Sequence, residues 1–261
     1  MELSITTDYA AECGDPSPYL RRIADAGFTH VHWCHQWSAD FLYSRWEIEQ
    51  IKRWLVEYGL QLLDLHAPVG PEKNWASPKE YERLSGVELV QNRIEMTARL
   101  GADVIIMHIP GEPGCDPLRR SLDELEGFAR DLGVRIALEN GSFDAIRPVL
   151  EGHDPGYLGL CYDSGHGNRE GQSGLDHLES LKDRLISVHL HDNDGTADQH
   201  KLMFSGKVDW PRLARIMATS AYRKCVSMEV SMRRSGFEDE RAFLAVAYET
   251  GKRFTDMIGA F

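Results

Sequence analysis

Positive charge is scarce in this sequence. Its 261 residues include 29 lysines and arginines against 41 aspartates and glutamates, which gives a formal net charge of −12. A protein with this balance repels phosphate backbones and anionic lipid surfaces. The composition therefore disfavours nucleic acids and membranes as partners.

Cysteines and long apolar runs are also few. The five cysteines are widely spaced, odd in number and contain no Cys-x-x-Cys, which favours reduced thiols over a disulfide framework. The N-terminus shows no basic region followed by an apolar stretch, and no segment approaches the length of a membrane-spanning helix. We expect a cytoplasmic protein. No linker of Pro, Gly or Ser divides the chain, so residues 1–261 are expected to form a single domain.

Short apolar runs alternate with longer amphipathic segments along the whole chain. The expected strands cover residues 3–6, 28–33, 60–65, 104–107, 134–138, 157–162, 186–190 and 225–230. Helical patterns follow them, and several stop at a glycine that can adopt the left-handed cap. Eight such units predict an α/β fold, a closed (β/α)8 TIM barrel. An open doubly wound sheet is the alternative, because periodicity does not reveal closure, although the Gly-rich dinucleotide fingerprint is missing after the first strand.

Polar residues close six consecutive predicted strands. They are His66, His108, Glu139, Asp163, His189 and Glu229. The active site of a parallel barrel lies at the C-terminal ends of its strands, so these side chains are expected to converge. Three histidines and three carboxylates on one rim would repel one another or lack partners without a cation between them. Their nitrogen and oxygen donors suit zinc, manganese, iron or cobalt.

The stretch from Ile186 to His200 carries the densest set of candidate ligands. Strand alternation places Ile186, Val188 and Leu190 on one face and Ser187, His189 and His191 on the other. A polar loop then presents Asp198 and His200. This pattern predicts a buried strand that ends in a metal site.

The ordered motifs resemble a known family. They are His-Ala-Pro, His108, Leu-Glu-Asn, Asp-Ser-Gly-His, His-Leu-His-Asp, Asp-Gln-His and Met-Glu-Val. From about residue 66 to residue 229 they resemble the sugar phosphate isomerase/epimerase family of xylose isomerase-like TIM barrels, which is itself similar to endonuclease IV. The resemblance implies that one shared metal is bound by Glu139, Asp163, His189 and Glu229, with His166 near the substrate. The endonuclease-like pattern adds His66 and His108 for a second ion and His166, Asp198 and His200 for a third, so the number of ions stays between one and three.

The resemblance implies a divalent-metal-dependent isomerase or epimerase of a small sugar, keto-polyol or sugar phosphate. Glu139 and Glu229 would act as base and acid on the two sides of the reacting carbon, with the metal stabilising the ene-diolate. Further substrate contacts are expected from Trp33, Lys201 and Arg233. Family members are often dimers or tetramers, so a homo-oligomer is compatible with the resemblance.

Two other functions remain open. The same residues would serve an endonuclease IV-like multinuclear metallohydrolase of phosphate esters. The third possible function is that of a non-catalytic barrel that keeps its metal for binding. The predicted rim carries few cations for gripping phosphates, namely Lys201, Lys207, Arg169, Arg233 and Arg234, so a small carbohydrate is the expected partner.

Overall fold

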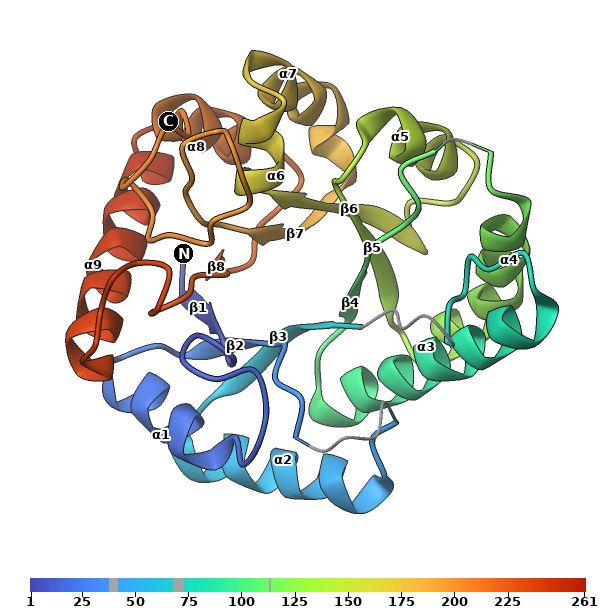
Figure 1. The fold of residues 1–261 in the computed structure, drawn as a ribbon, viewed down its shortest axis with the longest axis horizontal. Helices are drawn as coiled ribbons and strands as arrows, with labels where there is room; N and C mark the ends of the chain where they lie inside the picture. Colours follow the sequence, from blue (N-terminus) through green and yellow to red (C-terminus); the bar gives the residue numbers. More distant parts are fainter. Residues whose placement is uncertain (38–41, 68–72, 113) are drawn as a thin grey trace.

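Eight parallel strands surround a central axis, and helices cover their outer side (Figure 1). The computed structural model describes residues 1–37, 42–67, 73–112 and 114–261. Pro68, the last residue of the His-Ala-Pro motif, lies outside the described residues. The strands are β1 (Leu3–Thr6), β2 (His30–Trp33), β3 (Gln61–His66), β4 (Val104–Met107), β5 (Arg135–Glu139), β6 (Leu158–Asp163), β7 (Leu185–His189) and β8 (Val226–Met228). The helices are α1 (Ser17–Asp25), α2 (Arg45–Tyr58), α3 (Glu80–Leu100), α4 (Asp116–Asp131), α5 (Phe143–Glu151), α6 (Ser164–Arg169), α7 (Gln172–Leu181), η1 (Lys182–Arg184), α8 (Trp210–Thr219) and α9 (Glu240–Gly259).

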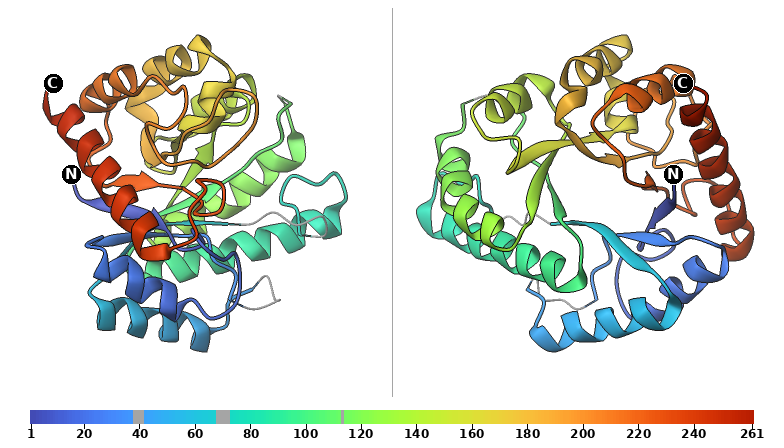
Figure 2. Two further views of the ribbon diagram at one scale, coloured as in Figure 1. Left: turned by 60° about the vertical axis from the view of Figure 1, so that its left-hand side comes forward. Right: turned by 180° about the vertical axis from the view of Figure 1, so that it is seen from behind.

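The sheet closes on itself. Its order is β7-β6-β5-β4-β3-β2-β1-β8, and the bridge between Leu190 and Met228 joins the two ends. There the Leu190 amide donates to Ser227 O at 2.9 Å and the Glu229 amide donates to Leu190 O at 3.2 Å. The two views in Figure 2 show the helices around the strands from the side and from behind. The expected (β/α)8 TIM barrel is confirmed, and the open-sheet alternative is wrong.

Local sequence signals set the ends of α2 and α3, and the glycine stops are as expected. Ser44 and Glu47 form a reciprocal capping box at the start of α2. The same helix ends at Gly59, whose φ of 69° is in the left-handed region, and α3 ends in the same way at Gly101. None of the helices in the described ranges is long and apolar enough to cross a membrane.

Two features of the sixth and seventh units differ from the sequence pattern. Helix α6 was not expected, because its sequence SGHGNR has no apolar period; Asp163 begins it by accepting the His166 amide hydrogen at 2.7 Å. In β7 the pairing with β6 skips one residue, so Ile186 is a bulge. Ile186 consequently packs with Ala137 and Cys161 inside the barrel, and its expected place beside Val188 is wrong.

Candidate metal centre

Four polar side chains meet at the C-terminal mouth of the barrel. Glu139, Asp163 and His189 are the last residues of β5, β6 and β7, and Glu229 directly follows β8. Each offers one ligand atom, and the four atoms all lie within 4.8 Å of one another. His189 Nδ1 is 2.9 Å from Glu229 Oε2 and 3.3 Å from Glu139 Oε1. We call these residues the four-ligand group.

The electrostatics of the four-ligand group fit a bound cation. Burial alone would raise the pKa of Glu139 and of Glu229, yet the facing His189 holds both pKa values well below the ordinary range. Three carboxylates share this mostly buried space with a single imidazole. Both ring nitrogens of His189 are buried, and neither forms a hydrogen bond of good geometry within the described residues, although Nδ1 lies within ion-pair distance of both glutamates. Buried nitrogens without partners are rare unless they bind something, and this donor set suits a divalent transition metal.

A second group shares Glu139 with the first. His66 Nε2 lies 3.1 Å from Glu139 Oε2, and His108 Nε2 lies 3.5 Å from the same oxygen. The other oxygen, Oε1, faces His189. The two oxygens of one carboxylate thus point to two different sets of nitrogens, so Glu139 could bridge two ions.

A third group lies beside Asp163. It comprises His191, Asp198 and His200. Asp198 Oδ2 is 2.8 Å from His200 Nε2, and Asp198 Oδ1 is 3.5 Å from His191 Nε2, which also lies 3.0 Å from Asp163 Oδ2. Burial would lower the pKa of His200, but Asp198 and nearby carboxylates raise it to about 9.

His191 was not assigned as a ligand from the sequence, although strand alternation placed it on the same face as His189. The resemblance put His166 in this third group instead. His166 stands slightly apart, with Nε2 3.7 Å from Asp198 Oδ2 and Nδ1 hydrogen-bonded to Asn140 O at 3.0 Å. His166 Nδ1 also lies 3.6 Å from Glu139 Oε1, so His166 lies next to both the third group and the four-ligand group.

A buried polar pair supports the four-ligand group from below. His32 Nδ1 lies 2.8 Å from Asp64 Oδ1, and Ser187 Oγ donates to the other carboxylate oxygen. The His32 ring contacts the His189 ring, with 4.4 Å between their centroids. His32 and His35 are both buried. The sequence could have identified Asp64 as an inward-facing residue, because it stands two residues before His66 and strand alternation puts both on the same face.

The residues that were expected to contact substrate lie in different environments in the structure. Trp33 is 1% exposed and donates its indole hydrogen to Tyr43 Oη, so we correct its assignment from substrate contact to core packing. Lys201 pairs with Asp192 through the backbone. Arg233 is exposed. Its neighbour Arg234, which donates to Asp198 O, lines the cavity next to the centre.

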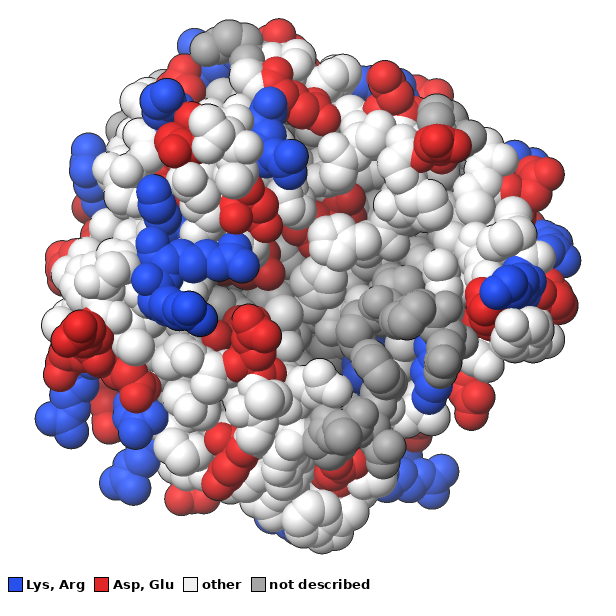
Figure 3. All heavy atoms as spheres, in the orientation of Figure 1, with Lys and Arg blue, Asp and Glu red and all other residues white. Residues whose placement is uncertain are grey.

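That cavity has a volume of about 130 Å³ and opens beside the four-ligand group. It is lined by Thr6, Asp8, Glu12, His200, Glu229, Val230, Ser231 and Arg234. Figure 3 shows acidic atoms within the central hollow and basic side chains gathered on one side of it. The hollow therefore presents carboxylates to a bound cation.

Comparison with known proteins assigns the family. A family model described as a xylose isomerase-like TIM barrel matches residues 20–247. The chain belongs to this family. An uncharacterized protein of Sinorhizobium fredii, y4fM, is 31% identical to this xylose isomerase-like barrel over 92% of this chain and 89% of that protein. A probable endonuclease 4 of Staphylococcus carnosus is 30% identical over 56% of each chain. The crystal structure of a D-tagatose 3-epimerase-like protein has a TM-score of 0.81 at 21% identity and covers 100% of this chain and 99% of that chain.

Proposed function

We propose that this xylose isomerase-like barrel is a divalent-metal-dependent epimerase or isomerase of a small sugar, keto-polyol or sugar phosphate. The observation that carries the proposal is the position of Glu139 and Glu229, which face the same His189 nitrogen from two sides of the barrel mouth. The similarity to a D-tagatose 3-epimerase-like fold supports it. Zinc, manganese, iron and cobalt all suit the four-ligand group.

Proton transfer would be carried by the two glutamates. When bound, the ion would polarise the substrate carbonyl and stabilise negative charge on its oxygen. Because their pKa values are lowered, Glu139 and Glu229 are both ionised at neutral pH. One glutamate would take the proton from the carbon next to the carbonyl, and the other, after it has taken a proton from water, would give that proton to the opposite face, while the first returns its proton to water. Return to the same carbon inverts its configuration, and return to the adjacent carbon interconverts aldose and ketose.

The surroundings suit a small hydroxylated substrate. Glu139 is 2% exposed and the side chain of Glu229 is 12% exposed, so bulk water is largely kept from both carboxylates. Arg234 and His200 border the adjoining cavity and could bind substrate hydroxyls. Asp8 and Glu12 line the same cavity and would repel a phosphate placed there. An uncharged sugar or keto-polyol fits this cavity best.

The decisive experiment is proton exchange in heavy water. The wild-type protein should incorporate deuterium next to the carbonyl of a ketose, and Glu139→Gln and Glu229→Gln should each lower turnover by about 10² to 10⁴-fold. Glu249→Gln, an exposed residue on α9, is the matched control and should retain full activity. Full activity in either glutamate variant, or no exchange into any ketose by the wild type, would contradict the proposal.

A second candidate function rests on the two additional groups. The groups around His66 and around Asp198 complete a set that could hold two or three ions, as the endonuclease-like resemblance implies. A multinuclear centre would favour hydrolysis of phosphate esters. Elemental analysis distinguishes the two functions, because one ion per chain supports the epimerase and two or three support the hydrolase. DNA binding that weakens steeply with salt would also support the hydrolase.

A further inference from the structure

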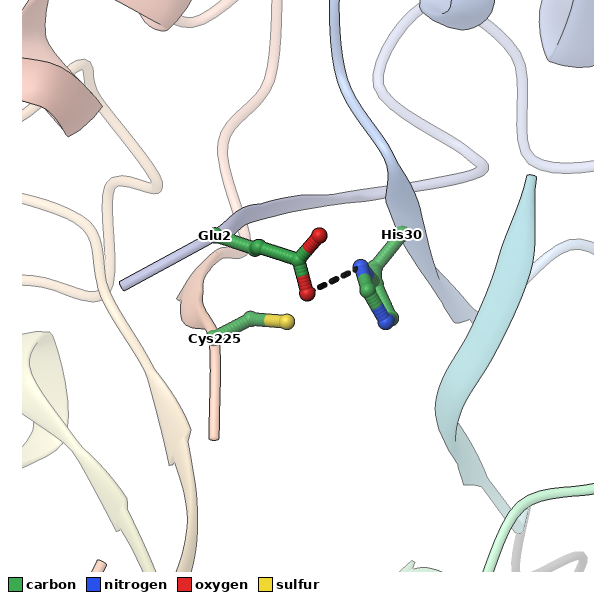
Figure 4. Close-up of side chains that lie close together, drawn as sticks. All are labelled: Glu2, His30 and Cys225. Atoms are coloured by element: carbon green, nitrogen blue, oxygen red, sulfur yellow. Dashed lines mark ion pairs between the residues drawn. The ribbon is translucent and has the colours of Figure 1, made fainter. Parts of the chain in front are cut away.

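A separate cluster of potential ligands lies at the opposite end of the barrel. Figure 4 shows Glu2, His30 and Cys225, with the Cys225 sulfur and the Glu2 carboxylate directed towards the His30 ring. Glu2 precedes β1, His30 begins β2 and Cys225 precedes β8. The N-terminal ends of these strands lie at the end of the barrel away from the four-ligand group. We call these three residues the N-terminal cluster.

Strand pairing fixes the positions of the three residues. Leu3 pairs with Val226 and Ser4 pairs with His30, so β1 lies between β8 and β2. The Val226 amide donates to Glu2 O at 2.9 Å. Because these are backbone bonds of a closed sheet, the three side chains start from fixed points, and only their own rotation is needed to bring them together.

The side chains offer one sulfur, one nitrogen and one oxygen ligand. Their ligand atoms all lie within 4.8 Å of one another, and Glu2 Oε2 is 3.8 Å from His30 Nδ1. Cys225 is 3% exposed and the His30 side chain is 12% exposed, whereas Glu2 reaches in from the solvent side. The cationic Lys224 beside Cys225 is paired with Asp103, so its charge is partly compensated.

We propose that Glu2, His30 and Cys225 form a second, independent binding site for a zinc-like divalent cation. A thiolate combined with an imidazole and a carboxylate favours zinc over magnesium, calcium or manganese. Three protein ligands leave one tetrahedral position for water, and a cavity of about 430 Å³ adjoins all three residues.

Binding of the cation would release one proton from the Cys225 thiol. Burial raises the pKa of the Cys225 thiol to about 12, so the thiol is protonated at neutral pH without an ion. The sulfur–hydrogen bond is replaced by a sulfur–metal bond, and the proton passes to water.

An ion at this site would stabilise the barrel around β8, the strand at which the sheet closes. β8 has only three residues, and its described pairing with the β7 side is the Leu190–Met228 bridge near the catalytic mouth. An ion in the N-terminal cluster would tie the other end of β8 to β1 and β2. This role needs no catalysis and does not depend on the proposed function.

Cobalt provides a selective test. The full-length protein is stripped of metal with a chelator and titrated with Co²⁺ while the near-ultraviolet thiolate-to-cobalt charge-transfer band is recorded. The four-ligand group contains no sulfur, so this band reports on a cysteine site alone. We expect the band in the wild type and its complete loss in Cys225→Ser. A wild type without the band, or a band that survives Cys225→Ser, would overturn the proposal.

Two further variants guard against misfolding and misassignment. Glu2 is exposed, so Glu2→Gln should fold normally and should weaken Co²⁺ binding at this site at least about tenfold while keeping the band. Unchanged affinity would remove Glu2 from the site and refute the three-ligand proposal. Cys34→Ser is the matched control, because Cys34 lies near His32 and Glu229 at the other end of the barrel. If Cys34→Ser rather than Cys225→Ser removes the band, the site has been assigned to the wrong cysteine.

Discussion

The buried contact between Asp64 and His32 offers the sharpest test of how the barrel supports its mouth. Asp64 is 2% exposed and accepts hydrogen bonds from His32 Nδ1 and from Ser187 Oγ. The pKa of Asp64 is lowered, because these partners outweigh the burial that would raise it. Its carboxylate is therefore ionised inside the protein, and Asp64→Asn removes that charge with almost no change in volume.

The expected cost follows from the burial of both partners. Removing one member of a buried, hydrogen-bonded pair costs about 3–5 kcal/mol. Asparagine keeps one acceptor oxygen, so we expect the lower end, about 3 kcal/mol of unfolding free energy. For a chain of this size such a loss corresponds to a decrease in Tm of about 6–12 °C.

Urea and thermal unfolding with chelator present measure this loss without a contribution from bound metal. Asp256→Asn, at an exposed position of α9, is the control and should change stability by less than about 0.5 kcal/mol. Because the folded pKa of Asp64 is lowered, its stabilisation is present above the unfolded pKa of about 3.9 and is lost as the pH falls through the folded value. The difference between wild type and Asp64→Asn should thus be full at pH 7 and should narrow below about pH 4. A variant as stable as wild type at pH 7 would refute the reasoning.

Two other predictions concern packing and metal at the mouth. Gly165→Ala would place its Cβ 1.9 Å from His191 Cε1, so we expect a loss of about 1–3 kcal/mol in thermal unfolding. Gly127→Ala in α4 meets nothing within 4 Å and should stabilise the protein by about 0.4–1 kcal/mol, and equal effects of the two variants would contradict the packing argument. Chelation should lower Tm, since it leaves the three carboxylates of the four-ligand group facing His189 alone. An added ion at 100 times its Kd should restore about 2.7 kcal/mol, and a Tm unaffected by chelator and by added ion would count against a bound metal.

Much of the mouth could be predicted because strand ends are local features. An apolar run that stops at a charged residue marks the strand, its end and the inward face at once, which is how Glu139, Asp163 and His189 were found. The structure brings these residues together with Glu229. His66, His108, Asp198 and His200 also lie in the groups expected beside them.

The residues that were missed or misassigned from the sequence share identifiable physical reasons. Asp64 and His32 lie within strands, where a polar residue in an apolar run carries no sign of its partner across the barrel. Trp33 is a residue type that could contact a sugar, but its burial and its hydrogen bond to Tyr43 assign it to the core. Ile186 was misplaced because one extra residue in β7 reverses the alternation on which its assignment depended.

The sequence by itself determined the order of the eight strands and of the helices between them except α6, the glycine stops and the residues at the strand ends, because these depend on neighbours a few positions away. Tertiary structure alone decided that the sheet closes between Leu190 and Met228 and that His32 is buried beneath His189. It also brought Glu2, His30 and Cys225 together. Such contacts join residues far apart in the chain, and only strand register and closure of the barrel fix which of them meet.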